Sequence, residues 1–591
     1  MGLLQKAVET YDAMEELAGV MKDGEEPLAP IGHICTKASI EITIDRNGQF
    51  IQAKKTDQKI IIPVTEKSSG RTSSAEAHPL CDQLVYISGC NGNGKKLDLF
   101  LNQLKHWCDF DHNEKLQAVR TYVSEGHVLN DLKEADLLDC DDKGIVKNEK
   151  ALVCWRVAGI SEEDSAVWTD KEIQNSFISY YSSLNSEAKK RLSYISGETD
   201  YVANQHLKGV FSMAGNAKLI SSNDTTNFTY RGRFMDSEEA LTVSYSDSQK
   251  AHNALKWVIS NQGSIVGGRA FVCWNPKGIK LPKPLLPVIN DNEKTRTPTD
   301  YKNELYKTIM GYSSKLSTID SAVIATFDAA TSGRLAVTYY NELQGSDFLS
   351  RLQDWDEWCC WYDNRWGTSA PYLRDILRFA FGVQRGTEES ALVDIDDRLL
   401  SQGMQRLLIS RLEKAPFPTD IMQALVQKTF RPESYNIKNR NKLHFITCAV
   451  VRKFRHDKYK EEWKMALQLD NNDRSYQFGR LLAVLEKAEK DAFREGETRE
   501  TNAIRMQSIF VQRPGYAAKI IIDQLKNAYY PHLHIGQRNY YEKMIGQIMQ
   551  VISEAGEDEY NKPLKETYIL GYYLQKNELY TKKDNRKEEE Q

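Results

Sequence analysis

Glycines and a lysine lie together at Gly92-Asn93-Gly94-Lys95, where backbone amides and a cation could hold a phosphate group. A loop of the nucleotide-hydrolysing type has four residues between its glycines and a Ser or Thr after its lysine. This segment has one residue between its glycines, and Lys96 follows the lysine. The pattern therefore predicts a turn without nucleotide hydrolysis, in which three side chains could contact a phosphate backbone: Asn91, Asn93 and Lys95.

Histidines and cysteines give no pattern of metal ligands. His532-Leu533-His534, His444 and His456 lack the His-Glu-x-x-His spacing, and the ten cysteines include no Cys-x-x-Cys pair. No Gly-x-Ser-x-Gly elbow for a nucleophilic serine occurs either. We therefore expect no metal site, no cofactor and no enzymatic activity, because an active site needs a combination of nucleophile, base or metal.

A short polar segment near the N-terminus combines small side chains with two cations. It consists of Lys67, Ser68, Ser69, Gly70, Arg71, Thr72 and Ser73. Small, cationic residues beside a hairpin suit entry into a narrow groove of DNA, where larger side chains would clash. The alternative is a solvated connection, which composition alone favours.

A second cationic group lies in the middle of the chain. Its members are Lys208, Asn216, Lys218, Arg231 and Arg233. In Tyr230-Arg231-Gly232-Arg233-Phe234 aromatic and cationic residues alternate, as they do in grooves that bind single strands. The same alternation also occurs in any half-exposed strand, so both interpretations stay open.

A third group of cations lies in the C-terminal region. Between residues 431 and 460 there are nine Lys and Arg residues against Glu433 and Asp457, so nine minus two leaves an excess of seven. Such a run is typical of a solvated face, but it could also contact phosphates. The candidates are Lys438, Arg440, Lys442, Arg452, Lys453 and Arg455.

The hydrophobic pattern indicates how these groups are positioned. Residues 2–19 have helical spacing, and residues 38–53 alternate around Arg46-Asn47-Gly48 as a β-hairpin. A third strand is expected at 59–64, followed by a loop over 65–78. Further expected elements are helical structure over 97–124, strands at 152–157, 269–274 and 321–327, and a helix over 237–260.

After residue 344 the pattern changes to successive helices. We expect helices at 347–361, 372–382, 396–412, 419–429, 442–454 and 474–494. The predicted fold class is α+β, with a mixed N-terminal and middle region containing β-hairpins and a C-terminal all-α bundle. Since 591 residues exceed one usual core, we expect three regions: 1–135, 136–345 and 346–591.

Composition limits the environment of the chain. The formal net charge is −4, which argues against coating nucleic acid with the whole surface but allows local basic grooves. No apolar stretch approaches the roughly 20 residues that span a bilayer, so no membrane association is expected. The ten cysteines include no Cys-x-x-Cys pair, which is typical of thiols in a reducing compartment. We therefore expect a cytoplasmic protein.

Several segments along the chain are similar to one known family. They are residues 28–32 with the 40–53 hairpin, 67–70, 80–89, 197–199, 206–210, 217–221, 271–274, 327–343, 476–486 and 570–583. In their order and spacing these segments resemble the large subunit of the type I-C CRISPR Cascade surveillance complex. The chain departs from the family at 71–78, where a more apolar continuation with a proline and an aromatic residue is expected.

The resemblance implies a function in antiviral defence. A subunit of this kind recognises the PAM, a short motif in target duplex DNA, while CRISPR RNA pairs with the target. It then promotes unwinding and R-loop formation, and it docks a helicase-nuclease. By this resemblance the segment at 67–73 recognises the PAM, and the C-terminal bundle is similar to the Cascade small subunit that contacts the displaced strand.

The resemblance also implies partners. These are CRISPR RNA, target double-stranded DNA, the backbone and crRNA-processing Cascade subunits, and a small subunit translated from the same gene, for which Met404 and Met422 are candidate starts. Two other classes of function remain open on the residues alone. One is a metal-dependent nuclease or RNA-processing enzyme, and the other is an architectural scaffold.

Overall fold

The computed structural model describes residues 2–71, 74–159, 165–186, 188–221, 234, 241–290, 296–331, 333–554 and 556–581. The chain forms two compact units that interleave in sequence. Unit 1 consists of residues 1–280 and 321–342, and unit 2 of residues 281–320 and 343–591. Each unit is described separately, and the expected boundaries at 135 and 345 stay a prediction.

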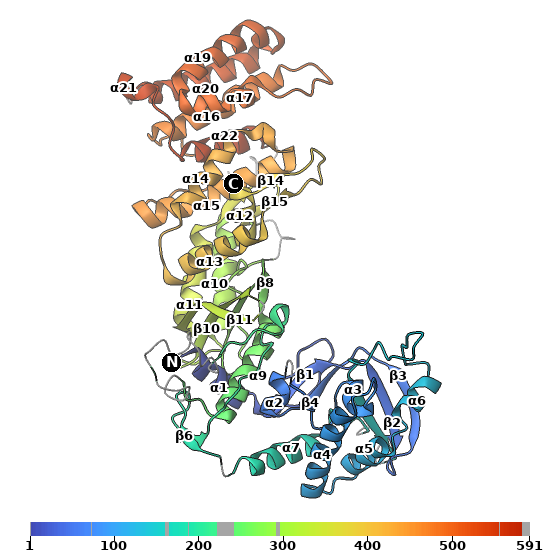
Figure 1. Cartoon of the computed structure of the whole chain (residues 1–591). Helices are drawn as coiled ribbons and strands as arrows, with labels where there is room; N and C mark the ends of the chain where they lie inside the picture. The colour runs from blue at the N-terminus through green and yellow to red at the C-terminus, as the bar shows by residue number, and fades with distance from the viewer. Residues whose placement is uncertain are drawn as a thin grey trace. The chain divides into compact units, whose positions relative to one another are not determined.

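The expected hairpin is confirmed as part of a three-stranded sheet in unit 1. Strand β2 (Ile40–Asp45) pairs antiparallel with β3 (Phe50–Lys55) and parallel with β5 (Val153–Ala158). Because alternate side chains point to one face, Ile40, Ile42 and Ile44 are all buried. Helices α4 (Gly94–Phe110) and α5 (Glu114–Glu125) contribute to the same core (Figure 1).

The helical region expected over 97–124 is interrupted. Helix α4 ends at Phe110, and α5 begins after Asn113, whose side chain accepts hydrogen bonds from two backbone amides of the next turn. An Asn at this position is a strong N-terminal cap, so it starts a new helix. The short helices α3 (Leu84–Ser88) and α6 (Val128–Glu134) and the longer α7 (Lys171–Leu184) complete this part of unit 1.

A two-stranded ribbon precedes the candidate DNA-contacting segment. Strand β4 (Lys59–Pro63) pairs with β1 (His33–Lys37), a strand that the sequence patterns did not indicate. The loop expected over 65–78 was wrong in its first part, since residues Glu66–Gly70 form helix α2. The physical reason is a capping box in which Thr65 and Ser68 each satisfy the other's backbone amide.

The second sheet of unit 1 has the strand order β11-β10-β9-β8. Its strands are β8 (Ser264–Val266), β9 (Arg269–Trp274), β10 (Ser321–Thr331) and β11 (Arg334–Gln344). Helices α1 (Leu3–Ala13) and α9 (Tyr245–Gln262) pack against each other and share its core. Of the helix expected over 237–260, residues 237–240 lie outside the described residues, and α9 begins at Tyr245 because Ser244 caps its first turn.

Two short antiparallel pairs, β6 (Lys190–Leu192) with β7 (Thr199–Tyr201) and Lys208 with Lys218, lie between α7 and α9. Lys218 also bridges to Arg334, and its amide donates to the Gly333 carbonyl at 3.2 Å. The segment that carries Lys208 and Lys218 is therefore anchored to the second sheet.

Unit 2 is mainly helical, and the α+β class is confirmed. Its longer helices are α10 (Pro298–Ser313), α11 (Gly345–Trp358), α12 (Leu373–Phe381), α13 (Asp397–Glu413), α14 (Thr419–Thr429), α15 (Ile437–Tyr459), α16 (Arg474–Asp491), α19 (Pro514–Gln524), α20 (Ile535–Ser553) and α22 (Tyr568–Tyr580). Two short ribbons, β12 (Trp361–Asp363) with β13 (Gly367–Ser369) and β14 (Val383–Gln384) with β15 (Val393–Asp394), interrupt the helices.

Helices α16 and α22 lie unusually close together. A Cβ at Gly479 would lie 1.9 Å from the Tyr568 carbonyl oxygen, and a Cβ at Gly571 would lie 2.0 Å from the Tyr476 carbonyl oxygen. Only glycine fits at either position, because both neighbours are backbone atoms. This crossing gives a structural reason for the glycines in two of the family-like segments.

Candidate nucleic-acid interface

One open pocket in unit 1 brings together residues from the first and the second cationic groups. It has a volume of about 490 Å³ and lies between α2 and residues 205–218. Its walls are formed by Lys67, Gly70, Arg71, Ser74, Glu76, Gln205, Lys208, Asn216 and Lys218. We call it the lysine pocket, and the sequence alone did not indicate that these two groups meet.

Helix α2 presents the pocket and buries its own serines. Ser68 is 1% exposed, and its hydroxyl lies 2.9 Å from His78 Nδ1, while the Ser69 hydroxyl donates to the Glu66 carbonyl. Burial lowers the pKa of His78 to about 4, so the ring is neutral. Ser68 and Ser69 therefore fix the helix, and the exposed Lys67 is the α2 cation that faces solvent.

Arg71 is held by a buried carboxylate. Its two terminal nitrogens bind Asp82, which is fully buried, and one of them also donates to the Glu76 carbonyl at 2.6 Å. The guanidinium lies 4.5 Å from the centre of the Tyr86 ring. A bidentate pair of this kind uses the donors of the arginine, so Arg71 positions the pocket wall.

Lys208 and Lys218 are the half-buried lysines of the pocket wall. They face each other across a β-bridge, and Lys208 Nζ donates to the Arg71 carbonyl at 3.2 Å. Among the described residues neither lysine forms an ion pair. Burial lowers the pKa of both, and for Lys208 the neighbouring Lys218 and Arg71 lower it further. Half-buried cations without a counter-charge favour a bound anion.

The predicted turn at residues 91–96 and the predicted segment at 67–73 both contact the ring of Tyr86. Lys96 Nζ lies 5.4 Å from the centre of the Tyr86 ring, whose other contact is Arg71. Asn91 binds the Val146 backbone and the Glu149 carboxylate, and Asn93 donates to the Cys90 carbonyl. Both asparagines therefore shape the turn, and Lys95 is exposed at the start of α4.

Four of the predicted residues lie outside the described residues. They are Thr72 and Ser73 of the first group, and Arg231 and Arg233 of the second. Asn216 is exposed on the wall of the lysine pocket.

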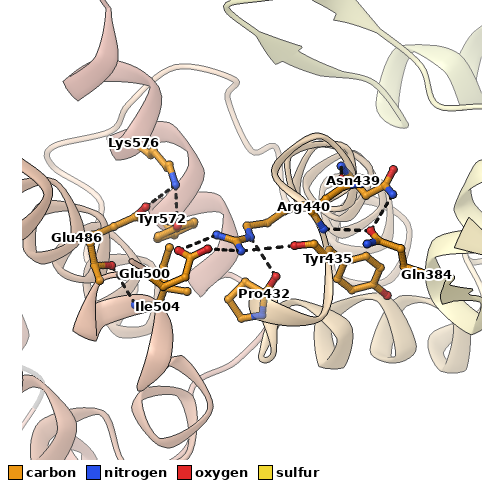
Figure 2. A network of polar contacts seen from close by, with 12 residues as sticks. Gln384, Pro432, Tyr435, Asn439, Arg440, Glu486, Glu500, Ile504, Tyr572 and Lys576 are labelled. Carbon is orange, nitrogen blue, oxygen red and sulfur yellow. Dashed lines mark hydrogen bonds and ion pairs between the residues drawn. The ribbon is translucent and has the colours of Figure 1, made fainter. Parts of the chain in front are cut away.

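The C-terminal cations are mostly paired inside unit 2. Arg440 binds Glu500 and the Pro432 carbonyl, as Figure 2 shows, and Lys442 pairs with Asp375. Arg452 donates to backbone carbonyls, Lys453 pairs with Asp354 and Asp457, and Arg455 pairs with Glu461 and Glu566. Within the described chain Lys438 is exposed and has no ion pair.

The histidines considered as ligands lie in structural positions. His534 Nδ1 accepts from the Gly536 amide at the start of α20, and His444 is buried with a pKa lowered by desolvation. Among the described residues no group of three His, Cys, Asp or Glu side chains could hold a metal ion. No helix in the described parts of the chain is long and apolar enough to cross a membrane.

Three residues of the site were missed by sequence reasoning. Arg71 is held by Asp82 and Tyr86, and Gly70 is approached by Gln205. The sequence around these three residues contains no motif that would mark them as part of a site. Asp82 and Tyr86 lie within a family-like segment, which was the one available signal.

The geometry defines the class of an α+β protein with a cationic pocket at a short helix. Over residues 8–580 the sequence matches the family model described as CRISPR-associated protein Csd1. The chain belongs to this family and is a Cascade-type large subunit, so its setting is a complex of Cas subunits with CRISPR RNA. No curated protein matches the sequence. The predicted resemblance is confirmed at the level of the family.

Proposed function

We propose that this chain is the non-catalytic large subunit of a type I-C surveillance complex, and that its lysine pocket holds a DNA backbone phosphate beside the PAM. Guide pairing supplies sequence recognition in such complexes, so the protein needs to recognise only a short duplex motif. Phosphate contacts fix the register of a protein on the duplex. The pocket therefore positions the DNA, and neighbouring residues of unit 1 read the motif.

The observation that carries the proposal is the pair Lys208 and Lys218. Both are half-buried, both lack a carboxylate among the described residues, and both have a lowered pKa. A phosphate at this place would offset their mutual repulsion and their desolvation, and Lys67 lies on the same rim. The structure gives no comparable pair for the C-terminal cations that it describes.

Membership of the family supports a wider proposal. After PAM recognition the complex opens the duplex, forms an R-loop and recruits a helicase-nuclease in the cytoplasm. The partners are CRISPR RNA, target duplex DNA, the backbone and crRNA-processing subunits, and a small subunit made from the same gene. The C-terminal helices contact the displaced strand in this scheme, for which Lys438 is the exposed candidate.

The test is the triple variant Lys67→Ala, Lys208→Ala and Lys218→Ala in the assembled complex. Its affinity for PAM-bearing duplex should fall by about tenfold or more, and the salt dependence should lose about 0.9 in log-log slope for each phosphate released. Affinity for a target that is already open beside the PAM should fall less, because pairing with the guide then contributes more.

Two exposed lysines outside the pocket provide the matched control. Lys105 on α4 and Lys133 on α6 carry the same charge, and neither lines the pocket. Replacing them with Ala should leave the affinity within about twofold, since each adds only screened long-range attraction. An equal loss for pocket and control variants, or for closed and open targets, would reject the proposal.

A further inference from the structure

A second pocket of unit 1 lies directly beside the lysine pocket. Its volume is about 320 Å³, and Lys208 forms part of both walls. Ser69 lines the second pocket, whereas its neighbours Lys67 and Gly70 line the first. The end of α2 and Lys208 therefore separate two adjoining cavities. We call the second one the histidine pocket.

Three of the four lysines that line the histidine pocket have a carboxylate partner among the described residues, and the fourth is Lys208. Glu26 binds Lys59 at 2.6 Å and Lys256 at 3.0 Å, and Lys256 also donates to the Cys35 carbonyl at 2.8 Å. Lys37 pairs with Asp57 at 3.1 Å. Ile34, Leu207 and Val210 add apolar surface to its walls.

His252, on the wall of this pocket, has a ring nitrogen whose hydrogen-bonding capacity the described residues do not use. Its Nδ1 lies 2.7 Å from the Ser248 carbonyl, which can only accept, so Nδ1 carries the proton and Nε2 is an acceptor. The residue is 1% exposed, and Nε2 has no hydrogen-bond partner among the described residues. Burial lowers the pKa of His252 to about 4, which keeps the ring neutral. A buried acceptor of this kind favours a ligand that donates.

Metal binding does not explain the pocket. Burial raises the pKa of Cys35 to about 12, so its thiol stays protonated, and His252 would be a single neutral ligand. A metal site needs several ligands that converge on one point. Among the described residues no such group occurs.

We propose that the histidine pocket takes up one unpaired nucleobase, next to the phosphate held in the lysine pocket, and that His252 Nε2 accepts a hydrogen bond from its amino group. This inference rests on the proposed function of the lysine pocket. The volume lies near the lower end of the range of about 300–1,000 Å³ found for small-ligand pockets, which suits a single base. Extruded bases are held by apolar contact and by hydrogen bonds to their polar edge.

Because Lys208 lines both pockets, it links the phosphate site to the base site. Phosphate and base of one nucleotide would occupy adjoining cavities, so binding of the phosphate brings the base to the second cavity. A captured base cannot re-pair with its former partner. The pocket would thus favour the first step of duplex opening, and adenine, cytosine or guanine, which carry amino groups, would be held better than thymine.

The first experiment places 2-aminopurine at successive positions beside the PAM in duplex targets for the assembled complex. Its fluorescence rises when it leaves the base stack, so one position should brighten on binding. Ser212→Trp should abolish that rise, since Ser212 is an exposed residue on the pocket wall and a large ring there would fill the cavity. Ser212→Ala is the control and should retain the rise.

The second experiment replaces the acceptor. His252→Asn keeps an amide donor near the position of Nδ1 for the Ser248 carbonyl but removes Nε2. In the parent complex an abasic site or thymine at the responding position should weaken binding by about 2- to 10-fold, the worth of one neutral hydrogen bond. The variant should lose this discrimination while its melting midpoint stays close to that of the parent.

The outcomes separate the two proposals. If no position brightens, or if Ser212→Trp leaves the rise unchanged, while the triple lysine variant still loses affinity, the base pocket is wrong and the phosphate site stands. If the triple lysine variant keeps its affinity, the phosphate site fails, and the base pocket fails with it. Discrimination that survives in His252→Asn would also overturn the role of Nε2.

Discussion

Lysines of the unit 1 pocket and the cations of α15 in unit 2 have the same charge but opposite surroundings. Lys208 and Lys218 lack a carboxylate among the described residues, and their pKa values are lowered. On α15, Arg455 is clamped by two carboxylates, which raises its pKa, and Lys453 is 4% exposed between two more. The first pair binds a phosphate only in the function proposed above, whereas the second set is neutralised by carboxylates of the chain itself.

A run of cations in a sequence does not by itself form a cationic surface in the folded protein. Helix α15 passes through the interior of unit 2, and more than half of its residues are buried. The acids that neutralise it come from distant positions, such as Asp354 and Glu566. Counting charges within residues 431–460 gave an excess of seven because these acids lie outside the window.

The largest effect is expected where a paired cation is fully enclosed. Arg411 on α13 binds Asp356 and the carbonyls of Pro284 and Leu286, and both charged side chains are 1% exposed. Arg411→Ala should lower the free energy of unfolding by about 3–5 kcal/mol, because it leaves a buried carboxylate without its paired cation. Urea denaturation of the purified chain measures the change.

Arg406 on the same helix is the matched control. Its pair with Asp420 is exposed, with 49% and 55% of the side chains accessible. Arg406→Ala should cost at most about 1 kcal/mol, as exposed ion pairs do. If Arg406→Ala and Arg411→Ala lowered the free energy of unfolding equally, buried and exposed ion pairs of unit 2 would not differ in their contribution to stability.

A smaller effect of opposite sign is expected in the lysine pocket. A lowered pKa means that the folded protein holds the proton of Lys218 less tightly than the unfolded chain does, so the charge costs stability at neutral pH. Lys218→Met, which keeps the aliphatic stem, should therefore raise the melting midpoint at pH 8. The advantage should shrink as the pH approaches the ordinary lysine value of 10.5.

Melting curves of Lys218→Met and the parent chain, recorded between pH 7 and pH 10.5, measure this difference. Lys105→Met serves as a control, since Lys105 is an exposed lysine outside the pocket. A fall in the melting midpoint of Lys218→Met at pH 8 would show that the lysine stabilises the fold. It would contradict the expected difference between the lysine pocket and the paired cations of α15.

The smallest effect is expected for Lys438, the exposed member of the C-terminal set. Lys438→Ala should leave the melting midpoint unchanged, because exposed substitutions usually stay within about 0.5 kcal/mol. If it contacts the displaced strand, the salt dependence of R-loop formation should lose about 0.7 in log-log slope, the value for a single-stranded phosphate. An unchanged slope would favour a scaffold role for this face.

Local patterns predicted much of the fold. The alternation at 38–53 gave the hairpin, and the spacing within 474–494 gave α16, since both signals depend only on neighbouring residues. The pairing of β2 with β5 was not predictable, because these strands lie about a hundred residues apart in the chain. Strand β1 was missed because it lies beside β4 as a two-stranded ribbon without a clear alternation.

The site was predicted as separate parts. Lys67, Lys208 and Lys218 were chosen for their charge, but their meeting in one pocket depends on the bridge between Lys208 and Lys218 and on the fold around α2. The capture of Arg71 by Asp82 could not be inferred either, because a carboxylate eleven residues away has many other places to lie. Residue types indicated the chemistry, and tertiary contacts determined which residues are available for it.

The interleaving of the two units has a consequence for synthesis on the ribosome. Unit 1 needs residues 321–342 to complete its second sheet, yet residues 281–320, which belong to unit 2, emerge before them. The nascent chain must therefore carry α10 without its partners until α11 and β13 have been made. A chaperone or a neighbouring subunit that covers α10 during this interval would govern the yield of the whole protein.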